Sequence, residues 1–175
     1  MDGRIARLSA AVCVSCLIAP LAFCASPALA AGAGCDAGKW PLSAIQGRFG
    51  GTLPTVASGD ALPKLGAPAL VNLSAQGDVV FLHAPARPAK ANPAYAAVIK
   101  LGPEPAATYQ VTVSDGAWVD VVEGGEILKQ SGYVHRKDCP GVDKSIRFQT
   151  KGGPLTIQIS GAYAKTIKLE AARAE

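Results

Sequence analysis

The sequence predicts an all-β domain, an antiparallel two-sheet sandwich that is jelly-roll-like or, in broad terms, immunoglobulin-like. Three observations lead to this prediction. About eight or nine short segments alternate apolar and polar residues, which is the period of a half-buried strand. Glycine-containing pairs typical of tight turns separate several of them. Outside the first thirty residues no amphipathic stretch of about ten residues indicates a helix, so the helical crossovers of a parallel sheet are not expected.

Residues 1–30 have the pattern of a secretory signal peptide. Two arginines precede the apolar stretch 8–23, and 28–30 supply the small residues of a cleavage site. A membrane-spanning helix needs about 20 apolar residues, so this stretch is expected to meet the membrane only transiently, during export. Lipid attachment at Cys24 is the alternative, but bulky Phe23 stands where that processing needs a small residue. The sequence therefore predicts a periplasmic or secreted protein.

Export leaves two of the five cysteines, Cys35 and Cys139. A pair of cysteines in an oxidising compartment most simply forms a disulfide; free thiols and an intermolecular bond are the alternatives. On the chain-entropy model, closing a loop of about 100 residues contributes roughly 4.7 kcal/mol.

Residues 31–66 are rich in glycine and proline and predict an irregular N-terminal arm with one short helical turn from Pro41 to Ile45. Trp40 is expected to cover an end of the sandwich. Residues 67–175 form the predicted sandwich domain. Its candidate strands, in chain order, are 69–73, 79–82, 95–101, 108–113, 117–122, 126–130, 146–149, 155–160 and 166–170.

Charge and motif content exclude several functions. The chain has 17 Lys+Arg against 13 Asp+Glu, and the cations are scattered, so no nucleic-acid partner is expected. No glycine-rich phosphate cradle occurs. Two histidines leave little material for a metal site, and we expect neither a metal nor another cofactor.

Trp118 and Asp120 are the first candidate binding residues. They alternate with Val119 and Val121, which places them on the polar face of their strand. An exposed indole beside a carboxylate is suited to stacking a sugar ring and accepting its hydroxyl protons. The alternative is that Trp118 belongs to the core, because a register error of one residue exchanges the two faces.

The polar segment before Cys139 is the second candidate. Tyr133, His135, Arg136 and Lys137 are expected to lie on a loop held by the disulfide. A covalently held loop presents preorganised polar groups to an anion or a sugar. The alternative is a solvated connection without a ligand.

An enzyme and a protein-interaction module are the alternative classes of function. Ser131, His135 and Asp138 are the one compact Ser/His/Asp set, but no GxSxG nucleophile motif accompanies them, so no catalytic residue is predicted. The proline-rich segment around Arg87 is expected to be a stiff, exposed connection, with recognition by a protein partner as the alternative.

The stretches Thr108–Asp120 and Gly153–Tyr163 resemble bacterial pre-peptidase C-terminal domains and similar jelly-roll accessory modules. This resemblance implies a non-catalytic companion that binds polymers or aids secretion. The whole chain is also similar to a group of small exported bacterial proteins, some of which carry a homogentisate dioxygenase label. That activity needs two histidines and a carboxylate on iron, and only His83 and His135 are present.

Together these observations predict a non-catalytic binding or accessory module. Its expected partner is an unknown component of the cell envelope, a carbohydrate, a small anionic ligand or a protein.

Overall fold

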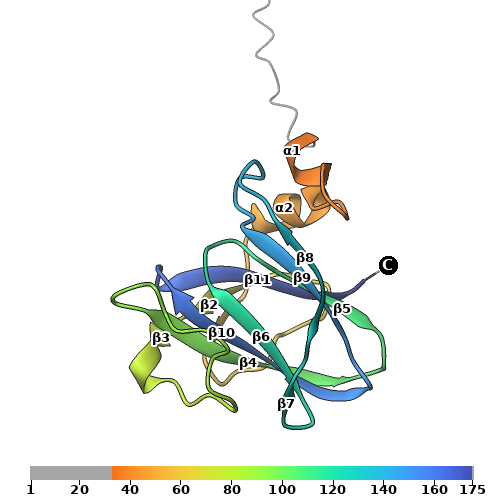
Figure 1. Ribbon diagram of the computed structural model, residues 1–175. Helices are drawn as coiled ribbons and strands as arrows, with labels where there is room; N and C mark the ends of the chain where they lie inside the picture. Colours follow the sequence, from red (N-terminus) through yellow and green to blue (C-terminus); the bar gives the residue numbers. More distant parts are fainter. Residues whose placement is uncertain (1–32, 175) are drawn as a thin grey trace, which may run out of the picture.

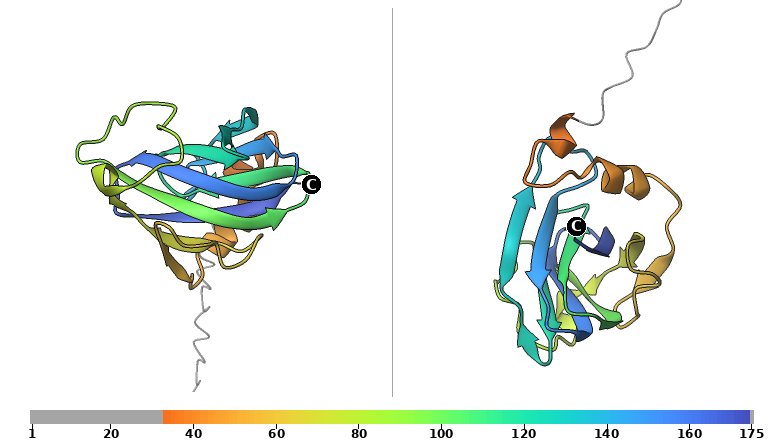
Figure 2. Two further views of the ribbon diagram at one scale, coloured as in Figure 1. Left: turned by 90° about the horizontal axis from the view of Figure 1, so that it is seen from below. Right: turned by 90° about the vertical axis from the view of Figure 1, so that its right-hand side faces the viewer.

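The computed structural model describes residues 33–174; the predicted signal peptide lies outside the described residues. Two sheets pack face to face, with the N-terminal helices against one of them (Figures 1 and 2). The prediction of an all-β sandwich is confirmed. No helix in this described range is long and apolar enough to cross a membrane.

The six-stranded sheet has the order β1 (Thr55–Ala57), β2 (Ala69–Asn72), β11 (Thr166–Arg173), β5 (Thr108–Val113), β9 (Lys144–Gln149), β8 (Gln130–His135). The five-stranded sheet has the order β3 (Ser74–Ala75), β4 (Tyr95–Glu104), β10 (Gly153–Ala162), β6 (Trp118–Glu123), β7 (Glu126–Ile127). Strands β1 and β2 run parallel, and the other neighbouring strands run antiparallel. The remaining elements are α1 (Ala33–Asp36), α2 (Ser43–Phe49) and the 3₁₀ turn η1 (Gln76–Asp78).

The main strands alternate between the sheets along the chain. Strands β2, β5, β9 and β11 belong to the six-stranded sheet, and β4, β6 and β10 belong to the other. This alternation, with neighbours β2-β11-β5-β9 in one sheet and β4-β10-β6-β7 in the other, is the arrangement of a jelly roll.

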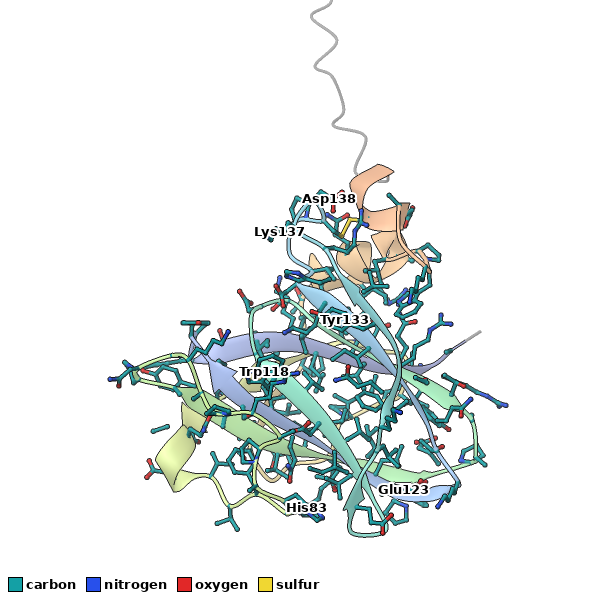
Figure 3. All side chains as sticks on the ribbon, viewed as in Figure 1. His83, Trp118, Glu123, Tyr133, Lys137 and Asp138 are labelled. Atoms are coloured by element: carbon teal, nitrogen blue, oxygen red, sulfur yellow. A yellow bond between two sulfur atoms is a disulfide. The ribbon has the colours of Figure 1, made fainter. Side chains whose placement is uncertain are left out.

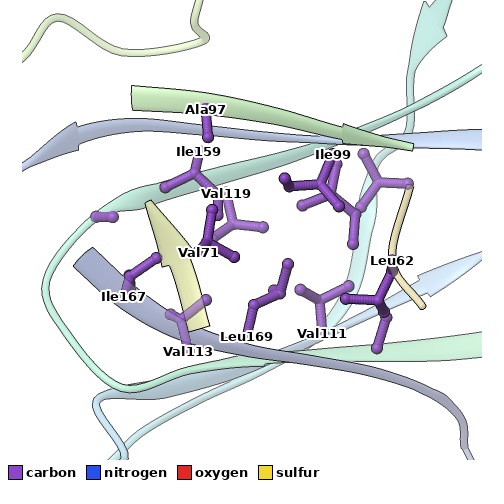
Figure 4. Close-up of a cluster of buried hydrophobic side chains, with 14 of the residues drawn as sticks. Leu62, Val71, Ala97, Ile99, Val111, Val113, Val119, Ile159, Ile167 and Leu169 are labelled. Carbon is purple, nitrogen blue, oxygen red and sulfur yellow. The ribbon is translucent and has the colours of Figure 1, made fainter. Parts of the chain in front are cut away.

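The core lies between the two sheets (Figure 4). Val111 and Val113 of β5 face Ile157 and Ile159 of β10, and all four side chains are buried. Each of these strands alternates apolar and polar residues because one face of its sheet is turned inward. The period-two segments therefore predicted the core correctly.

One predicted strand is wrong. Residues 79–82 do not pair with a strand; they begin a loop, residues 79–94, that crosses the outer face of the five-stranded sheet. The Gln158 carboxamide oxygen of β10 accepts hydrogen bonds from the backbone N–H groups of Leu82 and His83, at 2.8 and 3.1 Å. These bonds hold the segment against the sheet while Val80 stays 89% exposed.

The N-terminal arm covers the outer face of the six-stranded sheet. The predicted Cys35–Cys139 disulfide is present and belongs to a second hydrophobic cluster with Trp40, Leu42, Ile45, Phe49, Val134 and Val142. Trp40 lies on this outer face and not at an end of the sandwich as expected. Its indole N–H donates to Ser145 Oγ at 3.1 Å.

The arm is more regular than its composition predicts. Helix α2 begins at Ser43 and not at Pro41, because the Asp36 carboxylate accepts hydrogen bonds from the backbone N–H groups of Leu42 and Ser43, each at 3.0 Å. The bond from the Ser43 backbone contributes most to lowering the pKa of Asp36. Further along the arm, Val56 of β1 enters the main core.

Removing the disulfide is expected to destabilise the protein without changing its fold. We predict that Cys35→Ser together with Cys139→Ser lowers the free energy of unfolding by about 2–4 kcal/mol, because the cross-link closes a long loop in the unfolded chain. Urea denaturation followed by circular dichroism measures this loss. An unchanged midpoint would contradict the structural role of the disulfide.

Candidate functional site

A cavity of about 400 Å³ opens where β6 loses its neighbouring strand. We call it the edge pocket; its lining residues are Ala86, Arg87, Ala117, Trp118, Val119, Asp120, Gln130, Tyr133, Lys144 and Ile146. Strand β7 pairs with β6 at Val122 and Glu123, and the chain then crosses to the other sheet as β8. The first part of β6 is therefore a free sheet edge beside β8 and β9.

The backbone of β6 contributes polar groups to this edge. The carbonyl of Val121 accepts from Leu128 N–H at 2.8 Å, and the carbonyl of Ala117 accepts from Lys144 Nζ at 2.5 Å. Alternate residues of an antiparallel strand direct their backbone groups to the same side. Val119 lies between these two residues, so its N–H and C=O point toward the edge pocket.

Trp118 lies on the outer face of the sheet, as the alternation predicts, while Val119 and Val121 belong to the core. Its side chain is half-buried. The Arg87 guanidinium carbon lies 4.8 Å from the indole centroid, and Lys144 Nζ lies 5.6 Å from it. Cations at these distances are attracted to the electron-rich ring, which orients the indole at the pocket.

Asp120 is only 8% exposed. Its Oδ2 atom accepts a hydrogen bond from the Ala86 backbone N–H at 3.2 Å. This bond brings the 79–94 loop, and with it Arg87, to the pocket. A carboxylate has about four lone-pair sites, so Asp120 can still accept hydrogen bonds from a ligand.

Tyr133 enters the pocket from β8 and is 46% exposed. Partial burial, and secondarily the charge of Asp143, raises the pKa of the phenol above its usual value. Tyr133 therefore remains protonated at neutral pH and can donate a hydrogen bond. His135 lies two residues further on the strand, its ring stacked at 6.5 Å from that of Tyr133 and its Nε2 3.1 Å from Asp143 Oδ1.

The structure divides the residues predicted for binding. Trp118, Asp120 and Tyr133 line one pocket, although the sequence placed them in two separate candidate sites. His135 lies beside the pocket without lining it. Arg136 instead donates to the Gly34 carbonyl and to Asp138 Oδ2, and exposed Lys137 lies near the disulfide, away from Trp118 (Figure 3).

Three residues with polar side chains that line the pocket were not predicted as ligand contacts. Gln130 and Lys144 lie at strand ends, and Arg87 lies in the proline-rich loop. The sequence analysis named one of the three, Arg87, and only as part of a segment that a protein partner could recognise. Their convergence depends on the crossing from β7 to β8, which no local pattern indicates.

The considered Ser/His/Asp set does not converge. Ser131 and His135 lie four residues apart on β8, a separation of roughly 13 Å along a strand, and Asp138 accepts from Arg136. His83 bonds the Gly125 carbonyl at the β6–β7 turn, which precedes β8 in the chain, whereas His135 is the last residue of β8. The two histidines therefore lie toward opposite ends of this strand. Over residues 33–174, no group of three or more His, Cys, Asp or Glu side chains is placed to hold a metal ion.

The loop that carries Arg87 is held to the sheet mainly by Gln158. The Gln158 Oε1 atom accepts from the backbone N–H groups of Leu82 and His83, and its Nε2 atom donates to the His83 carbonyl at 3.1 Å. We predict that Gln158→Leu increases the hydrogen-exchange rates of the Leu82 and His83 amides at least tenfold, because three hydrogen bonds are lost.

Hydrogen–deuterium exchange followed by mass spectrometry measures this change. Thr156→Val is the matched control, since Thr156 lies two residues away on the same face of β10. Equal rates in the unaltered protein and the Gln158 variant would contradict the tether.

Comparisons of the chain with protein-family models, curated proteins and solved structures found no match. The resemblances to pre-peptidase C-terminal modules and to the small exported proteins remain predictions. The proposed function therefore rests on the chemistry of the edge pocket.

Proposed function

We propose that the protein is a non-catalytic binding module of the cell envelope and that the edge pocket holds a carbohydrate. The observation that carries this proposal is the meeting of a half-buried indole, a carboxylate and a phenol in one cavity: Trp118, Asp120 and Tyr133. A volume of about 400 Å³ lies within the usual range for small-molecule sites.

The polar groups of the pocket suit a ring that carries hydroxyls. A sugar hydroxyl both donates and accepts hydrogen bonds, so its site needs both kinds of partner. Asp120 accepts, Tyr133 donates, and the Gln130 carboxamide does both. The edge backbone of Val119 adds one donor and one acceptor.

Arg87 sets the charge preference of the pocket. Its guanidinium covers part of the Trp118 ring, while Lys144 is already paired with Asp143 at 3.3 Å. The ligand therefore contacts Arg87 together with the indole. An acidic sugar gains a charge-assisted hydrogen bond there, whereas a neutral sugar has to displace the guanidinium from the ring.

An extracytoplasmic location supports this proposal. The disulfide is compatible with an oxidising compartment, and together with the predicted signal peptide it favours the periplasm or the secreted fraction. Envelope polysaccharides are the carbohydrates available there.

A protein partner is the second candidate, favoured by one observation. The free edge of β6 offers the N–H and C=O of Val119, and an extended peptide can pair with such an edge. This candidate predicts a co-purifying protein whose binding Arg87→Glu abolishes.

We predict that Trp118→Ala and Asp120→Asn each lower the affinity for a pocket-binding oligosaccharide at least tenfold, because they remove the stacking surface and the charged acceptor. Isothermal titration calorimetry with a panel of neutral and uronate-containing oligosaccharides measures this loss. Lys137→Ala is the control, since Lys137 lies outside the pocket. Arg87→Ala is expected to weaken only the binding of the uronate-containing members.

Two results would contradict the proposal. One is that no member of the panel binds at millimolar concentration. The other is that binding occurs but Trp118→Ala and Lys137→Ala change it equally.

A further inference from the structure

A second cavity, of about 390 Å³, lies between the N-terminal arm and the outer face of the six-stranded sheet. We call it the arm pocket. Trp40, Ile45 and Arg48 contribute from the arm, and Gln110, Arg147 and Glu170 contribute from β5, β9 and β11. It lies on the opposite face of this sheet from the core and shares no lining residue with the edge pocket.

Positive charge predominates in the arm pocket. Among the described residues that line it, Lys39, Arg48, Arg147 and Arg173 are positively charged and Glu170 is negatively charged. Glu170 is 1% exposed, and Arg48 already satisfies it with two hydrogen bonds of 2.8 and 2.5 Å. This bonding raises the pKa of Arg48 above its usual value, so its guanidinium stays charged and bound to Glu170, and the other cations remain to act on a ligand.

Arg147 is held in a fixed orientation at the wall of this cavity. Its guanidinium carbon lies 4.2 Å from the centroid of the Trp40 ring, and its Nε donates to Gln110 Oε1 at 3.0 Å. The stacking on Trp40 uses one face of the guanidinium, and the hydrogen bond to Gln110 uses its Nε–H group. Its terminal N–H groups form the planar fork that binds a carboxylate or phosphate through two parallel hydrogen bonds.

Further hydrogen-bond donors lie around Arg147. The Gln110 oxygen is occupied by Arg147, which leaves the amide N–H groups of that side chain. Lys39 brings an ammonium group from the arm. A site in which donors outnumber the remaining acceptors around a preorganised guanidinium favours anions over a neutral sugar.

We propose that the arm pocket binds a small molecule carrying two or more carboxylate or phosphate groups. A single carboxylate engages only the Arg147 fork, whereas a second anionic group reaches the Lys39 side of the cavity. This site is independent of the carbohydrate proposed for the edge pocket.

The test uses the full exported chain in which Trp118→Phe leaves Trp40 as the one remaining tryptophan of the two. Citrate and pyrophosphate are the probes, and acetate and inorganic phosphate are the matched simpler anions, all at constant ionic strength. Because Arg147 stacks on Trp40, binding is expected to change the Trp40 fluorescence saturably. We expect citrate or pyrophosphate to bind at least tenfold more tightly than acetate or inorganic phosphate, respectively.

Two variants decide which residues bind the anion. Arg147→Lys keeps the charge but removes the planar fork, and we expect at least a tenfold loss of affinity. Lys39→Gln is expected to cost about three- to tenfold. Its matched control is Lys100→Gln, since Lys100 is also exposed and lies on β4 of the other sheet; the expected change is below twofold.

The proposal is overturned if neither citrate nor pyrophosphate binds at millimolar concentration, or if Lys100→Gln weakens binding as much as Lys39→Gln. Undiminished binding by Arg147→Lys overturns it as well. If Arg147→Lys fails to fold, the comparison of Lys39→Gln with Lys100→Gln decides.

Discussion

Strand β6 pairs with β7 only at its last two residues, Val122 and Glu123, and the candidate site lies along the unpaired part of β6 that precedes them. The Gly124-Gly125 turn, with both residues at positive φ, folds β7 back on β6. The chain then leaves for the other sheet, where β8 pairs with β9 over a longer register. An unpaired edge invites unwanted strand pairing unless side chains cover it. Here Lys144 bonds the Ala117 carbonyl, and Trp118 and Arg87 cover part of the remainder. The groups that protect the edge are therefore the groups that line the pocket.

The arm fixes this arrangement from the other side of β8. Val134 belongs to the cluster around the disulfide and Trp40, and successive side chains of a strand point to opposite faces. Anchoring Val134 against the arm therefore directs Tyr133 toward the edge pocket. The same arm encloses the arm pocket, where Arg147 stacks on Trp40. One covalently held segment thus positions both proposed ligand sites, on opposite faces of one sheet.

The sequence predicted those parts of the structure that local patterning determines. Alternation in β5 and β10 identified the core, the two cysteines outside the predicted signal peptide identified the disulfide, and the phase of β6 placed Trp118 beside Asp120 on the outer face. The sequence predicted a loop after Gln130 where the structure has strand β8. Val134 is the one buried side chain of this strand, so its sequence does not show the alternation of apolar and polar residues that identifies a strand. The apolar residues 79–82 resembled a strand, but the amides of Leu82 and of the next residue, His83, bond Gln158, which lies 76 and 75 residues away. Arg87 and Lys144 reach the pocket only through such long-range contacts.

An NMR titration of the ¹⁵N-labelled protein tests the carbohydrate site, with oligosaccharides that are released from bacterial cell-envelope polymers and carry at most one carboxylate. The two indole N–H signals report separately on the two faces: Trp118 on the edge pocket and Trp40 on the arm pocket. We predict that the Trp118 indole and the Val119 amide shift saturably while the Trp40 indole does not move. A shift of Trp40 without one of Trp118, or no shift at either residue, would contradict a carbohydrate site at the free edge of β6.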